Sequence, residues 1–171
     1  MTLKEAEIII EALIFASERP MRCKEISSLL DLKPSTVEAL IENIRERHEQ
    51  GALMIRNVAG GYQFVTKPEV APWIEKMGRP VVNTPLSLAS TETLAIIAYE
   101  QPVTKAEIEQ IRGVRSDSAL NNLMERELIC EMGRKEGPGR PILYGVTEKF
   151  LLHFGLKSLD ELPPISITPS K

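Results

Sequence analysis

Residues 94–108 read Leu-Ala-Ile-Ile-Ala-Tyr-Glu-Gln-Pro-Val-Thr-Lys-Ala-Glu-Ile, and residues 12–26 read Ala-Leu-Ile-Phe-Ala-Ser-Glu-Arg-Pro-Met-Arg-Cys-Lys-Glu-Ile. A shift of 82 residues superimposes identical side chains: Ala16 on Ala98, Glu18 on Glu100, Pro20 on Pro102, Glu25 on Glu107 and Ile26 on Ile108. The same shift places Tyr62 on Tyr144. The agreement predicts two copies of one small module within the chain.

The first copy has a clear predicted order of elements. We expect helices at about 3–17, 22–30 and 34–48, strands at 53–58 and 62–66, and a further helix at about 69–77. Ser35 and Glu38 have the spacing of a capping box, which predicts the start of the third helix. The only tryptophan, Trp73, falls in the last helix.

The second copy repeats this order. A helix at about 88–99 follows Ser87, and a capping box of Thr104 and Glu107 opens a second helix, which Gly113 ends. A helix at 117–127, strands at 128–132 and 142–146, and a closing helix at 148–154 complete the copy. Three helices followed by a hairpin are typical of the winged helix. The predicted fold class is therefore mainly α with small β-hairpins (α+β), as two tandem winged-helix domains.

The predicted domain boundaries follow from the repeat. Residues 78–87 contain two prolines and no periodicity, which favours a linker. We expect an N-terminal winged-helix domain at 1–80, a linker at 81–87, a C-terminal winged-helix domain at 88–164 and a flexible tail at 165–171. Each copy is small but long enough to bury one core.

Composition limits the location and the partners of the chain. Its 171 residues are 43% apolar and 26% charged, which excludes wholesale disorder. No apolar run approaches the roughly 20 residues that span a bilayer, and the acidic N-terminus is unlike a secretory signal. We therefore expect a cytoplasmic protein whose Cys23 and Cys130 stay reduced. The net charge of −3 argues against nucleic acid as the main partner.

The sequence offers no constellation for catalysis. Its two histidines, His48 and His153, lack metal-ligand spacing, and no nucleotide-binding or nucleophile motif is present. The glycine-rich stretch 137–141 contains prolines, which remove the amide donors that a phosphate cradle needs. We expect no enzymatic activity and neither a metal nor another cofactor.

Two helices are more apolar than docking on their own module requires. The apolar residues of 3–17 cover roughly 260° of the helix circumference at 100° per residue, whereas docking on one core needs an arc of somewhat over 100°. A homodimer would cover the second face, with Ile9, Leu13 and Ala16 as candidate contacts. The unbroken apolar hexapeptide 94–99 gives the helix 88–99 the same excess. The alternative is that the linker or the other module covers these faces.

A winged helix also raises the hypothesis of a DNA-binding transcriptional regulator. The predicted third helices carry many acids, among them Glu38, Glu42 and Glu125, which repel phosphate. One basic spot remains in the second hairpin, where Arg134, Lys135 and Arg140 could make a weak DNA contact. Sequence-specific recognition is not expected.

The motifs of the second copy resemble those of a known family. They comprise residues 92–108, Ile111-Arg-Gly-Val114, Gly139-Arg-Pro141 with Tyr144, Phe150-Leu-Leu-His-Phe-Gly-Leu156 and Leu162-Pro163. Together with Glu11-Ala-Leu-Ile-Phe-Ala-Ser17, they are similar to segregation and condensation protein B (ScpB) over roughly residues 3–164. Val146 departs from the family, which more often has a threonine there.

The resemblance implies a non-enzymatic subunit of the bacterial SMC–kleisin complex, which serves chromosome condensation and partition. It implies a homodimer through the N-terminal domain, binding to the kleisin ScpA, and a link to the SMC ATPase through that kleisin. DNA contact would be weak or indirect, and the location cytoplasmic at the nucleoid. For the kleisin we expect contacts at Leu94, Ile97, Ala98 and Tyr99.

Overall fold

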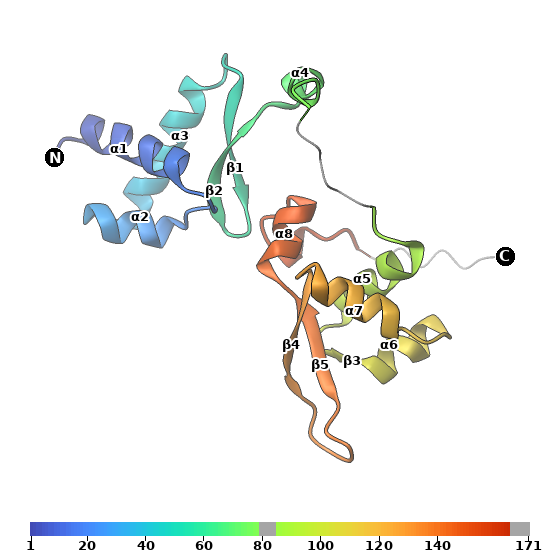
Figure 1. Cartoon of the computed structure of the whole chain (residues 1–171). Coiled ribbons are helices and arrows are strands. Elements are labelled where there is room, and N and C mark those ends of the chain that lie inside the picture. The colour runs from blue at the N-terminus through green and yellow to red at the C-terminus, as the bar shows by residue number, and fades with distance from the viewer. Residues whose placement is uncertain (79–84, 165–171) are drawn as a thin grey trace. The chain divides into compact units, whose positions relative to one another are not determined.

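The computed structural model of the chain describes residues 1–78 and 85–164 (Figure 1). By their internal contacts the residues form two compact units, Met1–Val81 with Leu156–Lys171, and Val82–Gly155. The predicted domain boundaries stay a prediction. Residues 81–84 of the predicted linker and the predicted tail 165–171 lie outside the described residues.

The first unit consists of helices followed by an antiparallel hairpin. Its elements are α1 (Leu3–Ala16), α2 (Cys23–Leu30), α3 (Pro34–Arg47), β1 (Leu53–Val58), β2 (Gly61–Thr66), the 3-10 turn η1 (Pro68–Val70) and α4 (Ala71–Glu75). β1 pairs with β2 from Leu53 opposite Thr66 to Val58 opposite Gly61. Three helices and a hairpin in this order confirm the winged-helix prediction for this unit.

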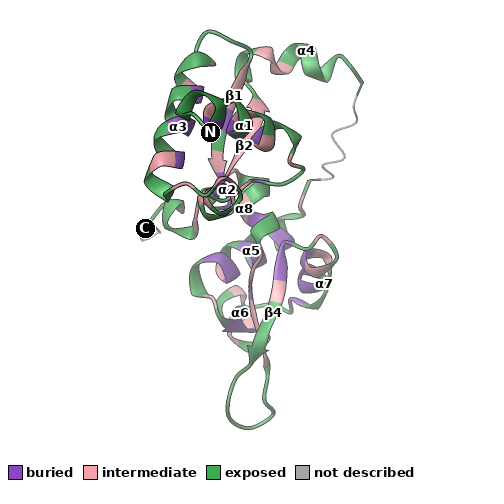
Figure 2. Cartoon of the chain, turned by 90° about the vertical axis from the view of Figure 1, so that its left-hand side faces the viewer, coloured by how far each residue is buried: buried purple, intermediate pink, exposed green. Residues whose placement is uncertain are grey.

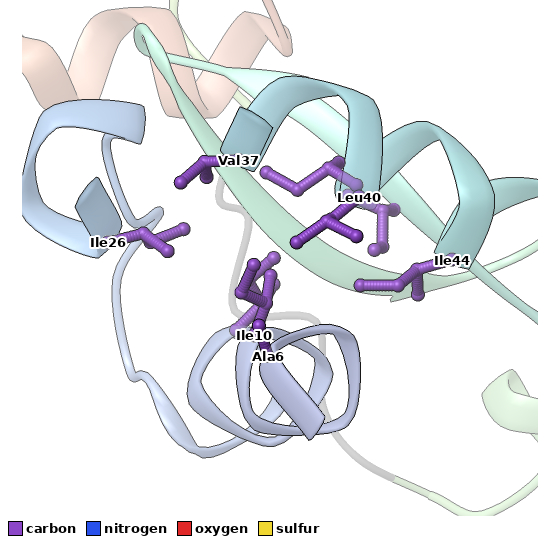
Figure 3. Packing of buried hydrophobic residues seen from close by; sticks show 9 residues of the cluster. Ala6, Ile10, Ile26, Val37, Leu40 and Ile44 are labelled. Carbon is purple, nitrogen blue, oxygen red and sulfur yellow. The ribbon is translucent and has the colours of Figure 1, made fainter. Parts of the chain in front are cut away.

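The core of the first unit lies between its three helices and the hairpin. α1 contributes side chains at a spacing of four, and α2 and α3 contribute the residues that face them (Figure 3). The buried cluster consists of Ala6, Ile10, Ile14, Ile26, Val37, Leu40, Ile41, Ile44 and Ile55. Aliphatic side chains of this kind supply most of the stabilisation of so small a unit.

Local start signals explain where these helices begin, with one correction. Thr2 caps α1 in a capping box with Glu5. The predicted capping box of Ser35 and Glu38 is wrong, because α3 already starts at Pro34, with Lys33 and not Ser35 at the N-cap. Proline fits the first position of a helix, where its missing N–H would have no partner in the helix anyway. Ser35 therefore lies inside the first turn.

The second unit repeats the order. Its elements are α5 (Leu88–Glu100), β3 (Val103–Thr104), α6 (Lys105–Arg112), α7 (Asp117–Glu125), β4 (Ile129–Arg134), β5 (Ile142–Val146) and α8 (Glu148–Phe154). The predicted caps are confirmed: Ser87, Thr104 with Glu107, and Thr147 cap the N-termini of α5, α6 and α8. Gly113 and Gly155 end α6 and α8 in the left-handed conformation that glycine adopts without strain.

The sheets show the duplication in their register. Val103 of β3 pairs with Tyr144 of β5, and Met21 forms an isolated bridge with Tyr62. The two pairs differ by the same 82 residues as the sequence repeat. The short strand β3 was not predicted, because two residues are too few to show alternation. The equivalent bridges confirm that one module occurs twice.

A segment from the far end of the sequence completes the first unit. The backbone N–H groups of Ala59 and Gly60, in the turn between β1 and β2, donate to the carbonyls of Leu156 and Lys157 at 2.9 Å each. A 3-10 turn, η2 (Leu159–Glu161), follows, and its Glu161 accepts a hydrogen bond from the Lys157 N–H at 2.6 Å. The first unit is therefore assembled from two separate stretches of chain.

Candidate protein-interaction surfaces

Helix α1 presents two apolar faces, of which only one belongs to the core. Its inner face is Ala6, Ile10 and Ile14, all buried. Four other large apolar side chains of the helix are exposed, namely Leu3, Ile8, Ile9 and Phe15, and of these Ile8 and Phe15 share one outer face. Exposed large apolar side chains on one helix mark a surface that binds another polypeptide when they lie together.

The predicted dimer residues lie on the surface side of α1. Ile9 is 39% exposed, Ala16 is exposed and Leu13 is half-buried. Their role in a dimer stays a prediction. Sequence reasoning did not name Ile8 or Phe15 as contacts, although both are exposed and Phe15 is 70% exposed. Their spacing of seven residues places both on one face of the helix, a signal that the sequence contains.

A groove runs between α1 and the hairpin. This α1 groove has a volume of about 330 Å³ and is lined by Ile8, Glu11, Ala12, Phe15, His48, Leu53 and Phe64. The Phe15 and Phe64 rings meet edge to face with centroids 6.2 Å apart, and His48 lies 5.2 Å from Phe64. Its walls are therefore mainly aliphatic and aromatic, as in sites that receive apolar side chains.

The polar members of the groove are held by ion pairs. Glu11 accepts hydrogen bonds from His48 at 2.7 Å and from Arg47 at 2.6 Å, and Arg47 also pairs with Glu7 at 3.1 Å. The hydrogen bond from His48, with smaller contributions from Arg47, lowers the pKa of Glu11. Because these charges already have partners, the groove can accept an apolar group without leaving them unpaired.

The predicted kleisin contacts on α5 divide into core and surface. Leu94, Ile97 and Ala98 are buried within the second unit, because α5 packs against α6, α7 and β5. Tyr99 is 37% exposed. All four remain a predicted contact, but only Tyr99 has appreciable surface to offer.

Other apolar side chains of the second unit are exposed as well. Among them are Ile111, near the end of α6, and Val114, just after it. Sequence reasoning treated their neighbours Arg112 and Gly113 as motif positions and missed the exposed pair. Arg112 itself is structural: its buried guanidinium pairs with Glu92 at 3.0 Å and donates to Ser116 at 2.9 Å.

The basic spot of the second hairpin is partly neutralised. Arg134, Lys135 and Arg140 are all exposed, as a nucleic-acid contact would require. However, Lys135 pairs with Glu107 at 2.6 Å, and Arg134 donates to the backbone carbonyl of Arg140 at 3.2 Å. The weak DNA contact stays a prediction, and the ion pair reduces its electrostatic share.

The described residues offer little for other chemistry. Within residues 1–78 and 85–164, His, Cys, Asp and Glu side chains nowhere gather in threes where a metal ion could be held. In the same ranges, no helix has the length and apolar character to cross a membrane.

Comparison with known proteins agrees with the geometry. The family model "Segregation and condensation complex subunit ScpB" matches residues 8–165. Segregation and condensation protein B of Symbiobacterium thermophilum is 47% identical over 100% of this chain and 78% of its own length. Its counterpart in Moorella thermoacetica is 51% identical over 91% of this chain and 80% of its own.

Among solved structures, one is described as a dimer of the ScpB N-terminal domain complexed with a ScpA peptide. It is 27% identical, with an alignment over 44% of this chain and 96% of that chain and a TM-score of 0.42. The family model and the two relatives extend over nearly the whole sequence, both modules included. The chain therefore belongs to the ScpB family of segregation and condensation complex subunits.

Proposed function

We propose that this chain is the ScpB subunit of an SMC–kleisin complex, without catalytic activity of its own. It forms a homodimer, binds the kleisin ScpA and reaches the SMC ATPase through that kleisin. Its place is the cytoplasm, at the nucleoid, where the complex condenses and partitions the chromosome. Family membership supports this function, and the exposed apolar face of α1 is the structural observation that carries it.

The homodimer is assigned to α1. Ile9, Leu13 and Ala16 form a stripe along the helix beside the buried face. A two-fold dimer uses the same patch on both chains, so a self-complementary apolar stripe suits it. Contact between two such stripes removes apolar surface from water, at about 25 cal/mol per Å².

The kleisin contact is assigned to the second unit. Tyr99, Ile111 and Val114 provide exposed aromatic and aliphatic surface at the ends of α5 and α6. Leu94, Ile97 and Ala98 support this surface from the core and set the position of α5. An apolar segment of the kleisin is the partner that such a surface fits.

Isothermal titration of the full chain with the middle segment of its cognate ScpA tests the function. We expect saturable binding with a negative heat-capacity change, because apolar surface is buried. A mobility-shift assay with random and genomic duplex DNA is the matched control, and we expect at most weak, salt-sensitive shifts. Tight DNA binding without kleisin binding would favour the transcriptional regulator instead.

Light scattering tests the dimer separately. Leu13→Asp places a carboxylate on the α1 stripe. If the stripe is buried between chains, the unpaired charge should weaken association by about 3–5 kcal/mol. We expect a folded monomer. Leu29→Asp, at an exposed position of α2, is the control. A dimer of unchanged mass in Leu13→Asp would remove the stripe from the interface.

A further inference from the structure

Helix α4 is a short element with apolar side chains on its surface. Trp73 is 66% exposed, and Ile74 and the nearby Met77 are exposed as well. All of its residues, Ala71–Glu75, are exposed or half-buried, and Figure 2 draws the helix without the colour of buried residues. An isolated helix of five residues gains too little from its own hydrogen bonds to be stable in water. It therefore needs a surface to pack on.

The repeat shows what the equivalent element does in the other copy. α8 follows the hairpin of the second unit as η1 and α4 follow the hairpin of the first. In α8, Phe150 is only 3% exposed, so this helix is docked. The same module therefore carries a docked closing helix in one copy and an undocked one in the other.

The α1 groove is the complementary surface. α1 ends at Ala16 and α5 at Glu100, 84 residues later, so Phe15 of α1 corresponds to Tyr99 of α5. Tyr99 is 37% exposed, whereas Phe15 is 70% exposed beside Ile8 and Ala12. Among the described residues, the first unit thus has an exposed apolar groove beside α1 and an exposed apolar helix, α4.

The segment that leads into α4 is fixed to the loop between α3 and β1. The Lys67 N–H donates to the Ala52 carbonyl at 2.9 Å, and the Lys67 ammonium donates to the carbonyl of Glu49. The Val70 N–H then closes the 3-10 turn onto Lys67. With its base held in this way, α4 lies apart from α1 in both views (Figures 1 and 2).

We propose that α4 of each chain docks into the α1 groove of a second copy, with Trp73 as the side chain that enters it. This inference rests on the proposed homodimer and names the element that completes it. The exchange of one identical element in each direction satisfies two-fold symmetry. The groove is also continuous with the predicted stripe, because Ala12 of the groove lies one helical turn from Ile9 and from Ala16 of the stripe.

The chemistry of the two surfaces matches. A tryptophan buries about 150–250 Å² and is among the strongest anchors of protein interfaces. Lys76 lies over one face of the Trp73 ring, 4.3 Å from its centroid, which leaves the other face for the partner. The stripe of Ile9, Leu13 and Ala16 alone is far smaller than the roughly 800 Å² per partner of a stable interface. The docked helix supplies the missing area.

Cysteine cross-linking tests the placement. In a Cys23→Ser, Cys130→Ser background, one tagged chain carries Ala12→Cys and a differently tagged chain carries Met77→Cys. We expect a disulfide between the two tags on mild oxidation. Leu29→Cys in place of Met77→Cys is the matched control, since it is also exposed but lies on α2. A further chain carries both Ala12→Cys and Met77→Cys. If its two cysteines form a disulfide within one chain while the disulfide between differently tagged chains does not form, the exchange is overturned.

The dimer dissociation constant provides the second measurement. We expect Trp73→Ala to raise it at least about tenfold, as loss of an interface tryptophan does, while Leu29→Ala leaves it unchanged. If the unsubstituted chain remains a monomer at every concentration, the homodimer itself fails. If it dimerises and Trp73→Ala binds equally well, only the docking of α4 is refuted.

Discussion

At the scale of single residues, Glu107 ties together two parts of the second unit. One carboxylate oxygen accepts from the N–H and the hydroxyl of Thr104, at 2.8 and 2.7 Å, and the other accepts from Lys135 at 2.6 Å. The hydrogen bond from Lys135, followed by those from Thr104, lowers the pKa of Glu107 to about 2. The same side chain thus starts α6 and holds the hairpin.

This pKa has a consequence for stability. Because the folded state lowers it from 4.5, the charged form stabilises the fold above about pH 4.5, and this contribution is lost as the pH falls towards 2. We expect Glu107→Gln to lower the melting temperature at pH 7, with the difference from the parent chain vanishing near pH 2. Thermal unfolding across this range measures it, and Glu125→Gln, on the exposed side of α7, is the control. An equal difference at every pH would contradict the assignment to charge.

Neighbouring residues on α1 give a second test. Ile14 is buried and Phe15 is 70% exposed, although they are adjacent in sequence. We expect Ile14→Ala to reduce the free energy of unfolding by about 2–5 kcal/mol, and Phe15→Ser to change it by less than about 1 kcal/mol while weakening the dimer. Denaturant unfolding and light scattering measure the two effects. The opposite ranking would mean that α1 is turned the other way.

At the scale of elements, local signals predicted most of the fold. The capping box of Thr104 and Glu107 and the left-handed Gly113 set the ends of α6 as expected, since both act within a few residues. The prediction of Ser35 as a helix cap was wrong because two start signals overlap there, and Pro34 occupies the first helical position. The strand β3 was not predicted, because it forms by a long-range pairing with β5 and its two residues show no sequence pattern of their own.

The candidate sites were harder to predict from the sequence. In the apolar hexapeptide 94–99 every residue type suits a core or an interface equally well. Packing on α6, α7 and β5 decided that Leu94 and Ile97 face inward and Tyr99 outward. Such a choice depends on neighbours distant in the sequence, which periodicity does not contain.

Helix α5 therefore allows a matched pair of variants. We expect Tyr99→Ala to weaken kleisin binding about tenfold or more, as at aromatic interface positions, with unfolding little changed. Ile97→Ala should instead destabilise the fold by about 2–5 kcal/mol, because it leaves a cavity. Titration calorimetry and denaturant unfolding distinguish them. Full kleisin affinity in a folded Tyr99→Ala chain would place the contact elsewhere.

At the scale of the whole molecule, the chain contains one module twice. The bridges of Met21 with Tyr62 and of Val103 with Tyr144 keep the same construction in both copies. The copies diverge after their hairpins, where α8 buries Phe150 and α4 exposes Trp73. The repeat was visible in the sequence, but this difference was not, because it depends on the surfaces that each closing helix contacts.

The segment after α8 gives a prediction at this scale. Deletion of residues 156–171 removes the carbonyls that accept from the N–H groups of Ala59 and Gly60. We expect hydrogen exchange at these two amides to accelerate at least about tenfold. The Tyr62 N–H, which donates to Met21 at 2.8 Å, is the internal control. Unaltered exchange at Ala59 and Gly60 would show that the two hydrogen bonds do not persist in solution.

The same two hydrogen bonds bear on how the protein is made. A ribosome delivers Ala59 and Gly60 early but Leu156 and Lys157 only after every residue of the second unit has been synthesised. The N-terminal unit can thus begin to fold during translation, but it reaches its finished form only when Leu156 and Lys157 have emerged from the ribosome. A ribosome that stalls between the two stretches leaves that unit open at its hairpin turn.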